Sequence, residues 1–174
     1  MNHAIEEIEI FDEFLDEALR QRVLEDMQRP KWSFTGGFAH SRFWHMDGLE
    51  QEEFYRTTLF GLVCERLGRP LELVRCYANG QTACQSGMPH HDDGELTFLY
   101  YPGPELVTGM GGSLVFLDSD GKSIPEHAEI LRAIAYKANR AVFFPASIAH
   151  HATAPDRHFG GVRVSVAWKM RRVG

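Results

Sequence analysis

The chain has 174 residues and a net formal charge of −6, and 44% of its residues are hydrophobic. This length and apolar content predict one globular domain, residues 1–174, with a substantial core. Acidic and basic residues are mixed without a Lys/Arg cluster, which argues against nucleic-acid binding. No apolar run is long enough to cross a membrane, and the N-terminus is acidic where a signal peptide would be basic. We therefore expect a cytoplasmic protein without a membrane partner.

The first 70 residues are predicted to be a mainly helical support. A short strand is expected around Ile8 and Ile10, where apolar and polar residues alternate. Residues 12–28 then carry apolar side chains at four-residue steps, which is typical of one face of a helix. That face consists of Leu15, Leu19, Val23 and Met27.

Residues 31–48 are rich in aromatic side chains and glycine, and we expect a long loop or irregular strands there. A second helix is predicted over residues 49–68, because Phe54, Leu59 and Val63 follow near-helical spacing. The sequence Gly-Arg-Pro then ends this helix in the usual way.

Residues 71–170 change in character, because short strand-like runs now alternate with turn sequences. The runs include "LELVRCYA", "ELTFLYY", "GSLVFLD", "EILRAIAY", "RAVFFP" and "GVRVSVAWKM". The predicted fold class is mainly β, within α+β: an antiparallel sandwich or jelly roll with the N-terminal helices packed on one sheet.

The run "GVRVSVAWKM" indicates how the last strand is oriented. Its valines and Trp168 alternate onto one face, which needs an apolar cover such as the helices. The opposite face consists of small residues apart from a single arginine, Arg163. A guanidinium that points into a β sandwich requires an anionic partner.

Two clusters of possible metal ligands occur at strand edges, "HHDD" at residues 90–93 and "HH" at residues 150–151. Because side chains alternate along a strand, either His90 with Asp92 or His91 with Asp93 points inward. Adding His150 or His151 gives two histidines and one carboxylate, a set that suits iron(II) in non-haem oxygenases.

Arg163 follows His150 by thirteen residues, which would place it on the strand beside that histidine. A guanidinium binds a carboxylate in a bidentate manner. A metal and Arg163 on one inner face would therefore clamp a dicarboxylate-like acid at both ends.

These stretches together resemble the iron(II)- and 2-oxoglutarate-dependent dioxygenases, in particular their prolyl-4-hydroxylase-like branch. The resemblance is carried by "CYANGQT", "HHDDGELTFLYYPGP", "GGSLVFLD", "NRAVFFPASIAHHA" and "GVRVSVAWK", in the order that the family shows. They cover roughly residues 71–169. The resemblance implies a double-stranded β-helix, with Fe(II), 2-oxoglutarate and O2 as cofactor and cosubstrates, and ascorbate as a further candidate cofactor.

The resemblance also implies the roles of individual residues. His90, Asp92 and His150 would bind iron, with His91, Asp93 and His151 as the alternative set. Arg163 would bind the distal carboxylate of 2-oxoglutarate, and two tyrosines would line the cosubstrate pocket. These tyrosines are Tyr77 and Tyr101.

The function expected from this resemblance is hydroxylation of an unactivated C–H bond, with release of succinate and CO2. The carboxylate of Asp92 favours this outcome, since halogenating relatives lack it. The substrate is expected to be a small molecule or amino acid rather than a peptidyl group of a protein. Two alternatives stay open: a module that binds metal or 2-oxoglutarate without turnover, and a zinc-dependent hydrolase.

Overall fold

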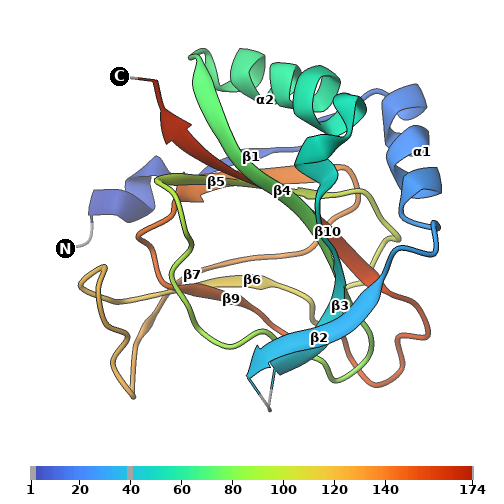
Figure 1. Cartoon of the computed structure of the whole chain (residues 1–174). Coiled ribbons are helices and arrows are strands. Elements are labelled where there is room, and N and C mark those ends of the chain that lie inside the picture. The colour runs from blue at the N-terminus through green and yellow to red at the C-terminus, as the bar shows by residue number, and fades with distance from the viewer. Residues whose placement is uncertain (1–2, 39–40, 174) are drawn as a thin grey trace.

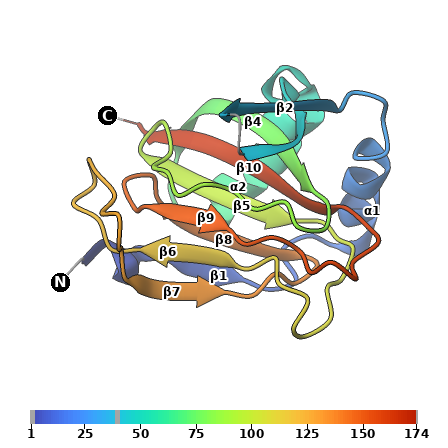
Figure 2. The same ribbon diagram turned by 90° about the horizontal axis from the view of Figure 1, so that it is seen from below.

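The computed structural model describes residues 3–38 and 41–173. Within these residues the strands form two antiparallel sheets, one of seven strands in the order β1-β8-β5-β10-β4-β3-β2 and one of three in the order β7-β6-β9. Figure 2 shows the smaller sheet as a layer beside the larger one. The strands are β1 (Glu9–Phe11), β2 (Ser33–Phe38), β3 (Ser41–Met46), β4 (Leu71–Gln81), β5 (Leu96–Tyr101), β6 (Leu114–Leu117), β7 (Ile130–Ile134), β8 (Arg140–Pro145), β9 (His150–Ala152) and β10 (Arg163–Arg172).

The two α-helices, with the π-helical turn that precedes the second of them, cover the outer face of the larger sheet, on the side away from the smaller sheet (Figure 1). This arrangement confirms the predicted double-stranded β-helix with its helices packed on one sheet. The described part of the chain has no helix long and apolar enough to span a membrane. The helical elements are η1 (His3–Glu7), α1 (Glu17–Asp26), η2 (Leu49–Gln51), the π-helical η3 (Phe54–Leu59) and α2 (Phe60–Leu67).

Helix α1 begins at Glu17, later than the start of the predicted helical segment at residue 12, and Asp16 caps it. The Asp16 carboxylate accepts a hydrogen bond from the backbone N–H of Leu19 at 2.8 Å. The predicted apolar face is directed inward, since Val23 and Met27 are both buried in the core beneath the larger sheet. The helix is therefore stabilised mainly by packing against the sheet.

The second predicted helix is divided into consecutive elements. Its first turn is η2, and the π-helical η3 then runs directly into α2. Leu59 and Val63 are fully buried, so the predicted apolar face is present. Gly68 ends α2 with a φ of 63°, a left-handed conformation that glycine adopts without a steric penalty.

The aromatic segment at residues 31–48 forms two paired strands, apart from residues 39 and 40, which lie outside the described residues. Strand β2 pairs with β3, and β3 extends the larger sheet beyond β4. The indole N–H of Trp32 donates to the carbonyl of Met27 at 2.8 Å, which ties this hairpin to the end of α1. The N-terminal region thus contributes strands as well as helices to the sandwich.

Strand β10 lies at the centre of the larger sheet, between β5 and β4. Val164, Val166 and Trp168 pack into the core under the helices, as the alternation predicts. The other face carries Lys169 as well as Arg163, so the expectation of a single cation on this face was wrong. Both side chains belong to the inner face because the residues differ by an even number along the strand.

The expected position of Arg163 beside His150 was also wrong. His150 lies on β9, which pairs with β6 in the smaller sheet. Arg163 begins β10, which pairs with β4 and β5 in the larger sheet. Residues 153–162 cross from one sheet to the other, so the two side chains face each other across the sandwich.

Candidate metal centre

A cavity between the two sheets collects most of the predicted site residues. The larger sheet contributes Tyr77, Arg163 and Lys169 to its wall, and the smaller sheet contributes His150. The loop before β5 contributes His90 and Asp92. Residues that are distant in the sequence therefore line one space in the interior of the fold.

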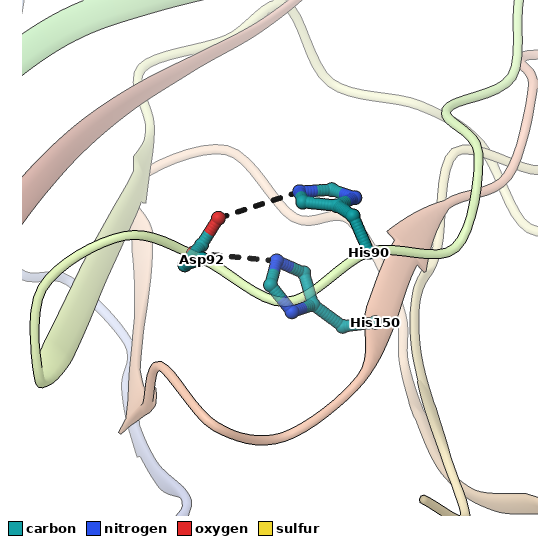
Figure 3. Close-up of side chains that lie close together, drawn as sticks. All are labelled: His90, Asp92 and His150. Atoms are coloured by element: carbon teal, nitrogen blue, oxygen red, sulfur yellow. Dashed lines mark ion pairs between the residues drawn. The ribbon is translucent and has the colours of Figure 1, made fainter. Parts of the chain in front are cut away.

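The side chains of His90, Asp92 and His150 converge in this cavity (Figure 3). Their potential ligand atoms all lie within 4.8 Å of one another. Nε2 of His90 lies 3.3 Å from Oδ1 of Asp92, and Nε2 of His150 lies 3.4 Å from Oδ2 of the same carboxylate. This is the compact three-sided arrangement that a single metal ion requires.

Backbone hydrogen bonds hold the two histidines together. His90 and His150 exchange a pair of backbone N–H to C=O bonds of 3.1 and 3.0 Å, which form an isolated antiparallel bridge. The backbone N–H of Asp92 also donates to the carbonyl of Ala146 at 3.0 Å. The loop that carries His90 and Asp92 is thus fixed to β9 and to the connection between β8 and β9.

The protonation of the two imidazoles follows from their hydrogen bonds. Nδ1 of His90 lies 2.8 Å from the carbonyl of Met88, and Nδ1 of His150 lies 2.9 Å from the carbonyl of Ile148. Because a carbonyl oxygen only accepts, each Nδ1 carries a proton, and each Nε2 faces the carboxylate of Asp92. With Nε2 unprotonated, the two rings and the carboxylate would be a donor set that fits a divalent metal.

The charges of the cluster are those of a metal site. Burial alone would raise the pKa of Asp92, but the Lys169 ammonium and the His150 ring outweigh it and hold this pKa well below its usual range. Burial lowers the pKa of His150 and outweighs the opposite effect of its contact with Asp92. Burial also opposes protonation of the half-exposed His90, but the hydrogen bond to Asp92 prevails and raises its pKa.

Arg163 lies at the other end of the same cavity and is 2% exposed. Its Nε donates to the carbonyl of Gly112 at 2.8 Å, and one terminal nitrogen donates to the side-chain oxygen of Gln81 at 2.9 Å. Within the described residues no carboxylate forms an ion pair with it. A buried guanidinium in this condition can bind an anionic group that enters the cavity.

Only small side chains separate Arg163 from the metal cluster along β10. Ser165 and Ala167 occupy the intervening inward positions. Ala167 lies opposite Tyr77 and Ser165 lies opposite Asn79 on β4, and both of these β4 side chains line the cavity. The cavity therefore extends past Ser165 from the metal cluster to the guanidinium.

The two tyrosines predicted for the cosubstrate pocket have different positions. Tyr77 lines the cavity near the metal cluster, where burial raises the pKa of its hydroxyl. Tyr101 is not part of the cavity wall. Its ring lies 5.1 Å from the Arg163 guanidinium carbon, and its buried hydroxyl has no hydrogen-bond partner among the described residues. Tyr101 therefore packs against the Arg163 guanidinium outside the cavity wall.

The alternative ligands point elsewhere. Nε2 of His91 lies 3.1 Å from the Ser119 hydroxyl, and Asp93 accepts from Arg75 at 3.0 Å near the surface. His151 alternates away from His150 along β9. These three residues do not join the cluster of His90, Asp92 and His150.

The residue prediction missed two members of the site, Lys169 and Thr97. The Lys169 ammonium contacts Oδ2 of Asp92, and the Thr97 hydroxyl donates to the same oxygen at 2.7 Å. The alternation that assigned Arg163 to the inner face extends to Lys169, so that signal was present in the sequence. Thr97 gave no signal of its own, since a threonine in a strand is ordinary.

Comparison with solved structures identifies the fold. HygX from Streptomyces hygroscopicus, with nickel, 2-oxoglutarate and hygromycin B bound, matches with a TM-score of 0.72 and 11% identity, over 99% of this chain and 88% of HygX. The epimerase SnoN, in complex with Fe3+, alpha ketoglutarate and nogalamycin RO, matches with a TM-score of 0.71 and 14% identity, over 95% of this chain and 78% of SnoN.

A prolyl-4-hydroxylase from Pseudomonas putida matches with a TM-score of 0.62 and 16% identity, over 96% of this chain and 93% of that enzyme. No protein-family model matches the sequence, and no curated protein matches it either. The chain therefore has the double-stranded β-helix fold of the iron(II)- and 2-oxoglutarate-dependent oxygenases, and its candidate metal centre lies between the two sheets of that fold.

Proposed function

We propose that the protein is an iron(II)- and 2-oxoglutarate-dependent oxygenase that hydroxylates a C–H bond and releases succinate and CO2. The observation that carries this proposal is the pairing of two features in one cavity. Two imidazole Nε2 atoms and the Asp92 carboxylate lie at one end, and the buried Arg163, which forms no ion pair with a carboxylate of the described residues, lies at the other. A zinc-dependent hydrolase would require the three ligands but leaves this guanidinium without a role.

Each residue has a defined part in this proposal. His90, Asp92 and His150 would hold the metal, and the cavity beside them would accept 2-oxoglutarate. The metal, when bound, supplies the oxidation chemistry. Arg163 binds the distal carboxylate of 2-oxoglutarate, Ser165 and Ala167 leave room for its carbon chain, and the sheets exclude water.

We further propose a small-molecule or amino-acid-like substrate. The two α-helices pack on the outer face of the larger sheet, away from the smaller sheet (Figure 1), and the cavity lining includes no residue of either helix. Phe43 on β3 lines the cavity, which supports a contribution of the aromatic hairpin to its entrance. HygX and SnoN were determined with hygromycin B and nogalamycin RO bound, which is consistent with a small substrate in this fold.

An anaerobic titration tests the proposed function. Fe(II) and 2-oxoglutarate, added together, should produce a visible charge-transfer band, and subsequent exposure to O2 should release succinate. Arg163→Leu should weaken 2-oxoglutarate binding by about 100-fold, since charge-assisted hydrogen bonds are lost, while metal binding persists. Arg22→Leu is the control, because Arg22 is exposed on α1, pairs with Asp26 and should leave both affinities unchanged.

The three alternatives give different results in this experiment. Folded protein that binds the metal but shows no charge-transfer band would contradict the proposal and favour a hydrolytic metal site. A band without succinate, across a panel of candidate substrates, would favour a binding module without turnover.

A further inference from the structure

Lys169 is a buried cation at the proposed metal site. It lies on the inner face of β10 and is 1% exposed. Its ammonium contacts Oδ2 of Asp92 and lies 3.2 Å from the Thr97 hydroxyl. Lys169 and Thr97 are direct cross-strand partners on β10 and β5, so the sheet itself fixes this contact.

The contact distinguishes the two oxygens of Asp92. Oδ2 receives the Lys169 ammonium and the Thr97 hydroxyl, which donates at 2.7 Å. Oδ1 is directed towards Nε2 of His90 at 3.3 Å, and Oδ2 also lies 3.4 Å from Nε2 of His150. Two protein donors already bind Oδ2, so Oδ1 is the oxygen with the freer lone pairs, and Asp92 would bind a metal mainly through Oδ1.

A second cation, Arg75, lies beside Lys169 on the neighbouring strand, but it is much more exposed to solvent than Lys169. Arg75 lies opposite Lys169 on β4 and pairs with Asp93. The Arg75–Asp93 pair is about half exposed, so solvent screens it. The Lys169–Asp92 pair is almost completely buried, so its charge acts on the metal site with little screening.

A fixed positive charge beside a metal site has opposite effects on the binding of the metal ion and on the binding of an anionic cosubstrate. It repels a divalent cation and competes with that cation for the carboxylate. It attracts a dianion such as 2-oxoglutarate, whose metal-binding end lies next to the same carboxylate. The charge therefore lowers the affinity for the metal and raises the affinity for the anionic cosubstrate.

We propose that Lys169 is a positioning residue that directs one oxygen of Asp92 to the metal and shifts the affinity of the site from the metal towards the dianionic cosubstrate. This inference rests on the proposed function, since it presumes that a metal and 2-oxoglutarate share the cavity. It also explains how a buried carboxylate is stabilised when no metal is bound, because Lys169 then neutralises Asp92.

Binding measurements on purified protein test this role without relying on turnover. Mn2+ affinity and the 2-oxoglutarate affinity of the Mn2+-loaded protein are measured by calorimetry. Lys169→Met keeps the side-chain length but removes the charge, and it should bind Mn2+ about tenfold more tightly and 2-oxoglutarate about tenfold more weakly. Lys169→Arg keeps the charge and should stay within about threefold of the wild type for both ligands.

Thermal unfolding gives an independent readout. Lys169→Met leaves the buried Asp92 carboxylate without its cation, so the metal-free variant should melt at a lower temperature than the wild type. Mn2+ should then raise its melting temperature by more than it raises that of the wild type, because a tighter ligand stabilises more strongly. Lys137→Met is the control, since Lys137 pairs with Asp12 at the surface. It should change neither ligand affinity.

Two outcomes would overturn the role of Lys169. A folded Lys169→Met protein that binds both Mn2+ and 2-oxoglutarate more weakly would show that the lysine only supports the structure. A variant with unchanged affinities for both would show that the lysine charge does not affect the site. If Lys169→Met does not fold, Lys169→Gln retains a hydrogen-bond donor without the charge and should show the same opposite shifts. Wild-type protein that binds Mn2+ but no 2-oxoglutarate would instead contradict the proposed function, and the Mn2+ arm would still test Lys169.

Discussion

Two adjacent histidines, His150 and His151, show how strongly one residue's position along a strand determines its chemistry. The His150 side chain is 5% exposed, its Nδ1 is fixed by the Ile148 carbonyl and its Nε2 is directed at Asp92. Burial also lowers the pKa of His151, but its buried Nδ1 has no partner among the described residues. Because neighbouring side chains point to opposite faces, only His150 is available to the candidate metal.

Separate alanine substitutions of this pair test the ligand assignment. His150→Ala removes one of three ligands and should weaken Mn2+ binding by more than about 100-fold, since even the loss of an outer-shell partner commonly weakens binding by 10–100-fold. His151→Ala should stay within about threefold of the wild type. The Mn2+-induced rise in melting temperature measures both effects. A larger loss of Mn2+ binding in His151→Ala than in His150→Ala would identify His151 as the ligand instead.

At the scale of single elements, the turn before β6 positions the guanidinium. The carbonyl of Gly112 accepts from Nε of Arg163, and its N–H donates to the carbonyl of Ala154 at 3.1 Å. The preceding Gly111 has a φ of 70°, and a Cβ added there would lie 2.3 Å from the Ala154 carbonyl oxygen. The turn can pack this closely against residues 152–162 only because glycine has no side chain.

Gly111→Ala should therefore loosen both the turn and the guanidinium. We expect a loss of about 2–4 kcal/mol in the free energy of unfolding, from the combined steric overlap and backbone strain. The 2-oxoglutarate affinity should also fall. Gly109→Ala is a matched control: its φ of 89° imposes similar strain, but a Cβ there meets no described atom within 4 Å.

Gly109→Ala should lose only about 1 kcal/mol and leave the 2-oxoglutarate affinity unchanged. Chemical denaturation measures the stabilities, and calorimetry measures the affinities. Equal losses for the two alanine variants would mean that the contact with Ala154 does not stabilise the turn.

At the scale of the whole molecule, the N-terminal segment is tied to residues more than 120 positions away. Oδ1 of Asp12 lies 2.7 Å from Nε of Arg140, and Oδ2 lies 3.2 Å from the Lys137 ammonium. The hydrogen bond from Arg140 and the further contact with Lys137 outweigh desolvation and lower the pKa of Asp12 to about 2. This carboxylate follows β1, the edge strand of the larger sheet, and its ion pairs join that strand to the start of β8.

This pairing predicts a pH-dependent contribution to stability. Because the pKa of Asp12 falls from 3.8 to about 2 on folding, its stabilisation is complete above about pH 4 and is lost as the pH falls through about 2. Asp12→Asn should lower the free energy of unfolding by about 1 kcal/mol at pH 7, a small value because the pair is partly exposed to solvent.

The stability difference between wild type and Asp12→Asn should shrink as the pH is lowered from 4 towards 2. Denaturation curves at several pH values measure this difference. Asp47→Asn changes an exposed carboxylate that forms no ion pair within the described residues, and it should have little effect at any pH. A difference for Asp12→Asn that stays constant down to the lowest pH would contradict the role of its charge.

The sequence by itself determined the local features of this protein. Alternation along residues 161–170 assigned Trp168 to the core and Arg163 to the inner face. The four-residue spacing in residues 12–28 predicted a helix, which the structure has as α1 over the shorter range Glu17–Asp26. These patterns depend on one strand or one helix, so they can be read without knowing its neighbours. The candidate ligand types were also evident from residue chemistry.

Only the tertiary structure decided how these parts meet. Whether His150 or His151 faces Asp92 depends on the pairing of β9 with β6, and the ammonium of Lys169 reaches that carboxylate because β10 pairs with β5. The opposition of His150 and Arg163 across the sandwich depends on a crossover between sheets. Register and sheet assignment are set by hydrogen bonds between segments distant in the chain, and a local pattern does not contain that information.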